Sequence, residues 1–180
     1  AKSDVPRDLT SQPGRHDLLQ RFLFLALIAG AVVVFRAAYE QLGNTVPLWA
    51  DGFVDRRVGA DLTIPVTWFL ALNSLTVFAL TPVFIYFWAK LGKRGIEPGS
   101  VSKMAIGAVM VGLSYLALAF FARLGGSHTP WPWMAVFVVA MTAGELWILP
   151  VGLGLFGRLA PAGFSATSIA LWFSAGFVGN

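Results

Sequence analysis

Long runs of apolar residues, separated by short polar connections, dominate the pattern along the chain. A bilayer core about 30 Å thick is crossed by roughly 20 apolar residues in a helix. On that length the sequence predicts five membrane-spanning helices after a polar lead-in at residues 1–21. Their approximate ranges are 22–46, 64–89, 104–122, 131–157 and 162–180.

These apolar runs do not alternate with polar residues, as the stretch FLFLALI at 22–28 illustrates. The strands of a membrane barrel would alternate, with apolar residues facing lipid and polar residues facing the lumen. In lipid the backbone must satisfy its own hydrogen bonds, which a helix does within one segment. The predicted fold class is therefore all-α, a polytopic transmembrane helical bundle.

The composition agrees with a membrane protein. Of the 180 residues, 57% are hydrophobic and 12% are charged, whereas a soluble domain carries about 25% charged residues. A fold this small cannot hide so much apolar surface from water. The absence of cysteine excludes disulfides and thiolate metal sites. His16 and His128 have no metal-ligand spacing, so we predict no metal site.

The basic residues predict the orientation of the helices. A net charge of +4 does not indicate nucleic-acid binding here, because the cations lie between apolar runs and not in one stripe. Cytoplasmic connections are enriched in Lys and Arg. We therefore predict a cytoplasmic lead-in and insertion in the plasma (inner) membrane. This orientation places nine cations inside, namely Lys2, Arg7, Arg15, Arg21, Lys90, Lys93, Arg94, Lys103 and Arg158, and three outside, namely Arg56, Arg57 and Arg123.

Two ionisable residues lie close together on the first predicted helix. Arg36 and Glu40 are four residues apart, which places them on one helix face where they can pair. One interpretation is a local ion pair near the outer interface. The other is a carboxylate that exchanges partners, or takes a proton, as an outer gate opens. The sequence leaves both interpretations open.

Glu145 lies alone in the fourth predicted helix, with no basic residue one turn away. Counted from Trp131, it lies roughly 21 Å along the helix, past the middle of the bilayer. An anion at that depth would attract the ammonium group of a substrate. The alternative is a structural carboxyl that a neighbouring helix satisfies. We favour function, because ionisable residues inside a membrane normally face a pathway or a partner.

Asn73 and Trp172 are two further candidates at similar depth. Asn73 can hydrogen-bond an amide or an amine, although interhelical contact is an equally common role. Trp172 could form an apolar pocket wall, although buried tryptophans often only pack. Together with Glu145 they are on three helices at mid-membrane depth, where transporters place their sites. The sequence contains no metalloprotease, nucleophile-elbow or phosphate-loop motif, so no enzyme is predicted.

Five segments of the chain resemble, in order, parts of the proton-dependent oligopeptide transporter family. They match its seventh and eighth helices, the loop that follows, and its tenth and eleventh helices. The segments are RAAYEQLGNTV (36–46), ALNSL (71–75), LGKRGIEPGSVSK (91–103), GELWILPVGL (144–153) and LWFSAGFVGN (171–180). Two positions depart from the family pattern, which often has tryptophan at Arg36 and serine at Leu149.

The resemblance implies the major facilitator fold, with this chain forming an incomplete C-terminal half and the N-terminal six-helix half elsewhere. It implies proton-coupled import of di- and tripeptides, with protons as the coupling ion and no other cofactor. Asn73 and Glu145 match positions that bind the amino end of the peptide, and Trp172 matches a pocket wall. Glu40, beside Arg36, matches a glutamate of gating and proton coupling. A transporter of another solute, such as nitrate or a drug-like molecule, and a non-transporting membrane scaffold remain alternatives.

Overall fold

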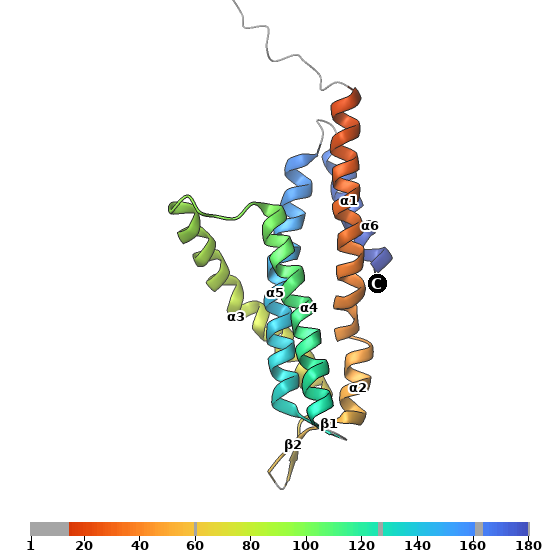
Figure 1. Cartoon of the computed structure of the whole chain (residues 1–180), viewed down its shortest axis with the longest axis vertical. Coiled ribbons are helices and arrows are strands. Elements are labelled where there is room, and N and C mark those ends of the chain that lie inside the picture. Colours follow the sequence, from red (N-terminus) through yellow and green to blue (C-terminus); the bar gives the residue numbers. More distant parts are fainter. Residues whose placement is uncertain (1–14, 60, 126–127, 161–163, 180) are drawn as a thin grey trace, which may run out of the picture.

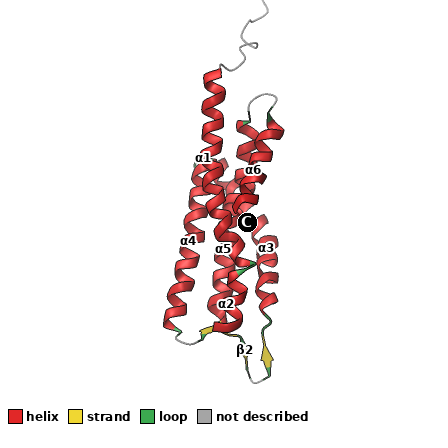
Figure 2. Ribbon diagram, turned by 90° about the vertical axis from the view of Figure 1, so that its right-hand side faces the viewer, coloured by secondary structure: helices red, strands yellow, loops and turns green. Residues whose placement is uncertain are grey.

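The computed structural model describes residues 15–59, 61–125, 128–160 and 164–179. Most of the predicted lead-in and residue 180 lie outside these residues. Helices form nearly all of the described chain, as Figures 1 and 2 show. They are α1 (Arg15–Tyr39), the 3₁₀ helix η2 (Glu40–Leu42), α2 (Thr45–Phe53), α3 (Val66–Lys93), α4 (Ser100–Leu124), α5 (Trp131–Leu159) and α6 (Ser165–Gly179).

Among the described residues, four helical stretches are long and apolar enough to cross a membrane. They are Leu19–Phe53, Val66–Lys93, Ser100–Leu124 and Trp131–Leu159, and α6 is a shorter apolar helix of 15 residues. The predicted range 22–46 is divided in the structure, because α1 ends at Tyr39 and α2 starts at Thr45. Pro47 has no N–H to bond to the carbonyl of Gly43, so a continuous α-helix would lack that hydrogen bond.

Helices α4 and α5 pack closely side by side along the centre of the bundle. Gly107 of α4 and Gly144 of α5 face each other in this contact. A Cβ atom built on Gly107 would lie 2.6 Å from the carbonyl oxygen of Gly144 and 2.7 Å from Cγ1 of Ile148. The two backbones therefore touch where neither residue has a side chain, as small residues allow in membrane helices.

The first and last helices form the second packed layer, with α1 and α6 side by side against α5. Leu25 and Phe156 are fully buried between these helices. Trp172 of α6 inserts against Gly152 of α5, where a Cβ atom would lie 2.2 Å from its ring. By contrast, α3 inclines away from α5 toward its C-terminal end (Figure 1), and Trp147 contacts it through aromatic rings.

Short strands close the end of the bundle that the sequence predicts to be outside. Strand β1 (Val54–Asp55) pairs in parallel with β4 (Thr129–Pro130), while β2 (Arg57–Val58) and β3 (Leu62–Thr63) form an antiparallel hairpin (Figure 2). Arg56 donates to the carbonyl of Ile64 at 3.0 Å and to Asp51 at 2.6 Å. The Arg57 guanidinium lowers the pKa of the exposed Asp55 carboxyl through hydrogen bonds. The β1–β4 pairing joins the loops after α2 and α4, and the Arg56 and Arg57 contacts order the loop after α2.

One hydrogen bond ties α4 to the last turn of α1. The hydroxyl of Tyr115 donates to the carbonyl oxygen of Ala38 at 2.6 Å. We expect Tyr115→Phe to lower the free energy of unfolding by about 1 kcal/mol, because the ring packing is kept and only the hydrogen bond is lost. Thermal unfolding of the complete protein in detergent measures this change. Tyr86→Phe is the control, since Tyr86 is exposed on α3; equal losses in both variants would contradict the assignment.

Candidate functional site

A cluster of polar side chains lies where α1, α3 and α5 meet. Its members come from positions far apart in the sequence: Arg36, Tyr39 and Glu40 around the end of α1, Asn73 on α3, and Thr142 and Glu145 on α5. Helix α1 ends at Tyr39, and the chain continues through the 3₁₀ turn that begins at Glu40 toward α2. We call this set the polar cluster.

Glu145 is the buried centre of the polar cluster. Only 8% of its surface is exposed. The side chains of Tyr39 and Asn73 lie within hydrogen-bonding reach of the carboxyl, and the charges of Arg36 and Glu40 also act on it. Its second oxygen, Oε2, is buried and accepts no hydrogen bond from the described residues. A buried carboxylate oxygen without a donor is costly, so this group is suited to receive a proton or a cation.

Asn73 makes the interhelical contact that the sequence left open as its alternative role. Its amide donates to Oγ1 of Thr142 at 2.8 Å. The Thr142 hydroxyl in turn donates to the carbonyl oxygen of Val138 at 2.7 Å. Since an asparagine amide has two N–H groups, Asn73 can hold α3 on α5 and still reach Glu145. Asn73 therefore joins the two helices and also lies beside Glu145.

Arg36 and Glu40 form the ion pair that their spacing indicates. Nη2 of Arg36 lies 3.3 Å from Oε1 of Glu40, and about a quarter of each side chain is exposed, 26% and 29%. The guanidinium carbon also lies 5.5 Å from the centre of the Tyr39 ring, which is cation–π range. A single, long contact at partial exposure stabilises little, so this pair can open at small cost.

Trp172 lies apart from the polar cluster. It is 7% exposed and packs edge-on against Phe156, with ring centres 5.3 Å apart. Trp172 and Arg36 together line a hollow of about 380 Å³ between α1, α5 and α6. Asn73 and Glu145 do not line this hollow, although Leu149, one turn beyond Glu145, does. Arg36 thus connects the polar cluster to the hollow that Trp172 borders.

Sequence reasoning did not single out Tyr39 and Thr142. Both could have been found from helical spacing, because Tyr39 is three residues from Arg36 and Thr142 is three residues from Glu145. Residues three apart lie on the same helix face. Spacing along one helix cannot show that these two helix faces meet each other.

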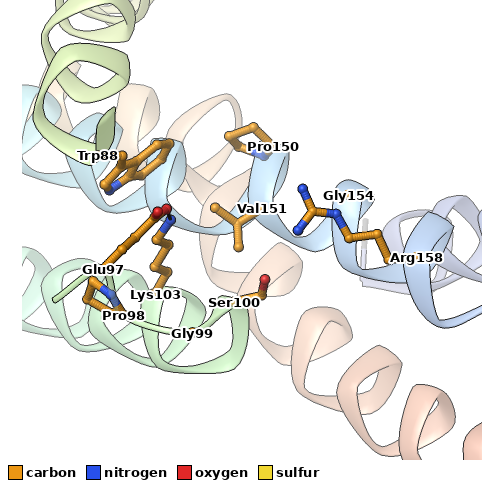
Figure 3. A pocket seen from close by; sticks show the side chains of 10 residues that line it. All are labelled: Trp88, Glu97, Pro98, Gly99, Ser100, Lys103, Pro150, Val151, Gly154 and Arg158. Atoms are coloured by element: carbon orange, nitrogen blue, oxygen red, sulfur yellow. Dashed lines mark hydrogen bonds and ion pairs between the residues drawn. The ribbon is translucent and has the colours of Figure 1, made fainter. Parts of the chain in front are cut away.

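A second hollow, of about 420 Å³, lies between the end of α3, the start of α4 and the second half of α5, and Pro150 lines both hollows (Figure 3). Lys103 is only 8% exposed there, pairs with Glu97, and places its Nζ 4.7 Å from the centre of the Trp88 ring. In Figure 3 the side chain of Arg158 lies beyond Val151, away from this pair. These partners satisfy the buried Lys103, which the sequence counted only as a cytoplasmic cation.

Within the described residues, no group of three or more acidic or histidine side chains could hold a metal ion.

Comparison with known proteins identifies the family. The model of the POT family matches residues 14–180. Peptide transporter YePEPT of Yersinia enterocolitica subsp. palearctica is 32% identical over 161 residues, covering 87% of this chain and 31% of that protein. A di-/tripeptide transporter of Lactococcus lactis subsp. cremoris is 31% identical over 150 residues, covering 81% of this chain and 30% of that protein.

Solved structures agree with this assignment. A crystal structure of peptide transporter POT in complex with sulfate has a TM-score of 0.82 at 32% identity, covering 89% of this chain and 32% of that one. A mutant of peptide transporter POT in complex with alafosfalin has a TM-score of 0.84 at 30% identity, covering 95% and 35%. The chain spans about a third of the length of these proteins, and the predicted fold class, a polytopic all-α bundle, is confirmed. The chain therefore belongs to the POT family and has part of its major facilitator fold.

Proposed function

We propose that this chain is part of a proton-coupled symporter that imports di- and tripeptides across the plasma membrane. The observation that carries the proposal is the buried Glu145 carboxyl, whose Oε2 has no hydrogen-bond donor in the part of the chain that the structure describes. The family, and relatives named as peptide and di-/tripeptide transporters, support the substrate class. The rest of the pathway, which we assign to an N-terminal six-helix half, completes the site.

In this proposal Glu145 binds the ammonium group of the peptide. An ammonium has three N–H donors and a positive charge, so it supplies both the donor and the counter-charge that Oε2 lacks. Tyr39 and Asn73 orient the carboxyl, because both lie within hydrogen-bonding reach of it. Trp172 forms an apolar wall of the neighbouring hollow. No metal or organic cofactor takes part, and the proton is the coupling ion.

Glu40 and Arg36 serve gating and proton linkage. Glu40 begins the 3₁₀ turn between α1 and α2, and α2 leads from there to the strands that close the outer end of the bundle. When Glu40 takes a proton, its attraction for Arg36 is lost, and Arg36 becomes available to other partners. The charge of Arg36 already acts on Glu145, so proton uptake at Glu40 changes the electrostatic environment of the binding carboxylate. In the proposed orientation, the start of α1 is cytoplasmic and Glu40 lies toward the outside.

Uptake of labelled dialanine tests the function. We expect the complete transporter, reconstituted in liposomes, to accumulate dialanine when the outside is more acidic than the inside. N-acetyl-dialanine should compete poorly, because acetylation removes the ammonium that Glu145 binds. Collapse of the proton gradient with an ionophore is the control and should stop accumulation.

Two outcomes would contradict this function. Competition by nitrate or a drug-like molecule, with none by unlabelled dialanine, would favour the same fold acting on another solute. No uptake of any solute by correctly folded protein would favour a scaffold, in which the polar cluster only joins helices.

A further inference from the structure

The hollow of about 420 Å³ between the end of α3, the start of α4 and the second half of α5 has an unbalanced charge (Figure 3). The ionisable residues of its lining are two cations, Lys103 and Arg158, and one carboxylate, Glu97. Lys103 pairs with Glu97. The positive charge of Arg158 is therefore left without a counter-charge in this lining, and the proposed transport site makes no use of it.

Arg158 offers unused hydrogen-bond donors to this hollow. It is exposed near the end of α5 and forms no ion pair within the described residues. In Figure 3 its guanidinium extends toward Val151, and the Ser100 hydroxyl points toward the same space. A guanidinium has five N–H donors in a planar fork, and a hydroxyl adds one more. These groups favour a ligand with anionic oxygen atoms, such as a phosphate, which a guanidinium binds through two parallel hydrogen bonds.

The position of Arg158 along α5 corresponds to the depth of lipid headgroups. It lies ~40 Å along the helix from Trp131, which is the first residue of α5. A hydrocarbon core is about 30 Å thick, and the two headgroup layers extend the bilayer to ~40–45 Å. With Trp131 at one interface, Arg158 reaches the headgroup layer of the opposite leaflet. In the proposed orientation that leaflet is the cytoplasmic one.

Further cations lie beside the hollow. Lys90 and Lys93 are in the last turn of α3, and Arg94 directly follows that helix. All three are exposed, and none forms an ion pair within the described residues. Basic pockets between membrane helices on the cytoplasmic side bind the headgroups of anionic lipids, because these cations attract the negative surface of that leaflet.

Apolar side chains beside the hollow suit the acyl chains of a lipid. Val101 follows Ser100 on α4 and is 48% exposed, and Leu153 precedes Gly154 on α5 and is 40% exposed. A phospholipid covers such side chains with its acyl chains while its phosphate contacts the guanidinium. A soluble phosphate would make only the second of these contacts. The combination therefore favours a lipid over a free anion.

We propose that this hollow binds the headgroup of an anionic phospholipid, with Arg158 as the main contact of its phosphate. The Ser100 hydroxyl donates a further hydrogen bond, and Lys103 adds positive charge while it stays paired with Glu97. A bound headgroup would join the start of α4 to the end of α5. The site contains no residue of the polar cluster, and it depends on the proposed orientation but not on the solute that is transported.

The test measures which of two lipids the purified complete protein retains. The protein is incubated with an equimolar mixture of dioleoyl-phosphatidylglycerol and dioleoyl-phosphatidylcholine, and native mass spectrometry counts the bound molecules of each. Both lipids have a phosphate and the same acyl chains, but only phosphatidylglycerol has a net negative charge. The wild type should prefer it roughly tenfold, as expected for a charge-assisted pair. Arg158→Gln should reduce the preference to about twofold or less, and Ser100→Ala should lower it by a smaller factor, about twofold.

The matched control is Arg123→Gln, which removes an exposed cation from the last turn of α4, at the other end of that helix. It should keep the wild-type preference. Neither Arg123 nor Arg158 forms an ion pair within the described residues, so both variants should unfold at the wild-type temperature in detergent without added lipid. Equal losses of preference in the two arginine variants would overturn the inference, and so would an unchanged preference in Arg158→Gln.

Glycerol 3-phosphate is the soluble probe, since it carries the phosphate without acyl chains. It should not displace bound phosphatidylglycerol; displacement would show that the hollow takes a free phosphate and would overturn the lipid assignment. Wild-type protein that retains both lipids equally, or neither, would also overturn it, the latter because another part of the complete protein then covers the hollow. Lipid retention is measured without transport, so failure of dialanine uptake contradicts the proposed function and leaves this result separate.

Discussion

Glu145→Gln in the complete transporter is expected to abolish proton-driven accumulation of dialanine. Glutamine has nearly the same shape as glutamate, but it cannot carry the negative charge that the ligand ammonium requires. Loss of a charge-assisted hydrogen bond in a buried site costs about 1.5–3 kcal/mol, or roughly 10- to 100-fold in affinity. The measurement is uptake of labelled dialanine by liposomes with an imposed pH gradient, compared with binding from the shift in melting temperature.

Two further variants make this result specific. Glu145→Asp keeps the negative charge on a side chain that is one methylene shorter, so the carboxylate lies farther from the ligand. We therefore expect weakened but measurable uptake of dialanine. Asp61→Asn removes an exposed carboxyl in the hairpin between β2 and β3 and should accumulate dialanine like the wild type. The Glu145→Gln variant should not melt earlier than the wild type, because a neutral side chain replaces a buried acid whose Oε2 accepts no hydrogen bond. Normal accumulation by Glu145→Gln would refute the role of this carboxyl in transport.

Gly107→Ala is expected to destabilise the bundle strongly for so small a change. The added methyl group would lie 2.6 Å from the Gly144 carbonyl oxygen and 2.7 Å from Cγ1 of Ile148. Since the first of these atoms belongs to the backbone, α4 and α5 must move apart along their shared contact. Overpacking of this kind costs about 1–3 kcal/mol. Thermal unfolding of the complete protein in detergent should show a clearly lower melting temperature.

Gly112→Ala on the same helix is the matched control. Apart from the neighbouring backbone of its own helix, no atom of the described residues lies within 4 Å of a Cβ built on Gly112. Alanine also favours the helical backbone over glycine by about 1 kcal/mol. The two substitutions are chemically identical and five residues apart, so they should change the melting temperature in opposite directions. Similar shifts in both would show that the close approach of α4 and α5 does not limit stability.

Several features of the protein follow from sequence and local geometry alone. The membrane helices were predictable because each segment in lipid must satisfy its own backbone hydrogen bonds, which a helix does. The length of each apolar run also shows whether a helix can cross the bilayer. The Arg36–Glu40 pair was predictable for the same kind of reason, since four residues bring two side chains to one helix face. The end of α1 before Thr45 was also readable from Pro47, although the predicted range ran on to residue 46.

The relations between helices were decided only by the tertiary structure. Apolar positions surround each membrane helix, because lipid and neighbouring helices are equally apolar, so hydrophobic periodicity does not show which faces meet. For that reason the sequence placed Asn73 and Glu145 at similar depth but could not show that Thr142 holds Asn73. Nor could it show that Tyr39 reaches Glu145, or that Trp172 packs on Gly152 and borders a hollow that Asn73 and Glu145 do not line. Depth along the membrane is a property of one helix, whereas a binding site depends on how several helices pack together.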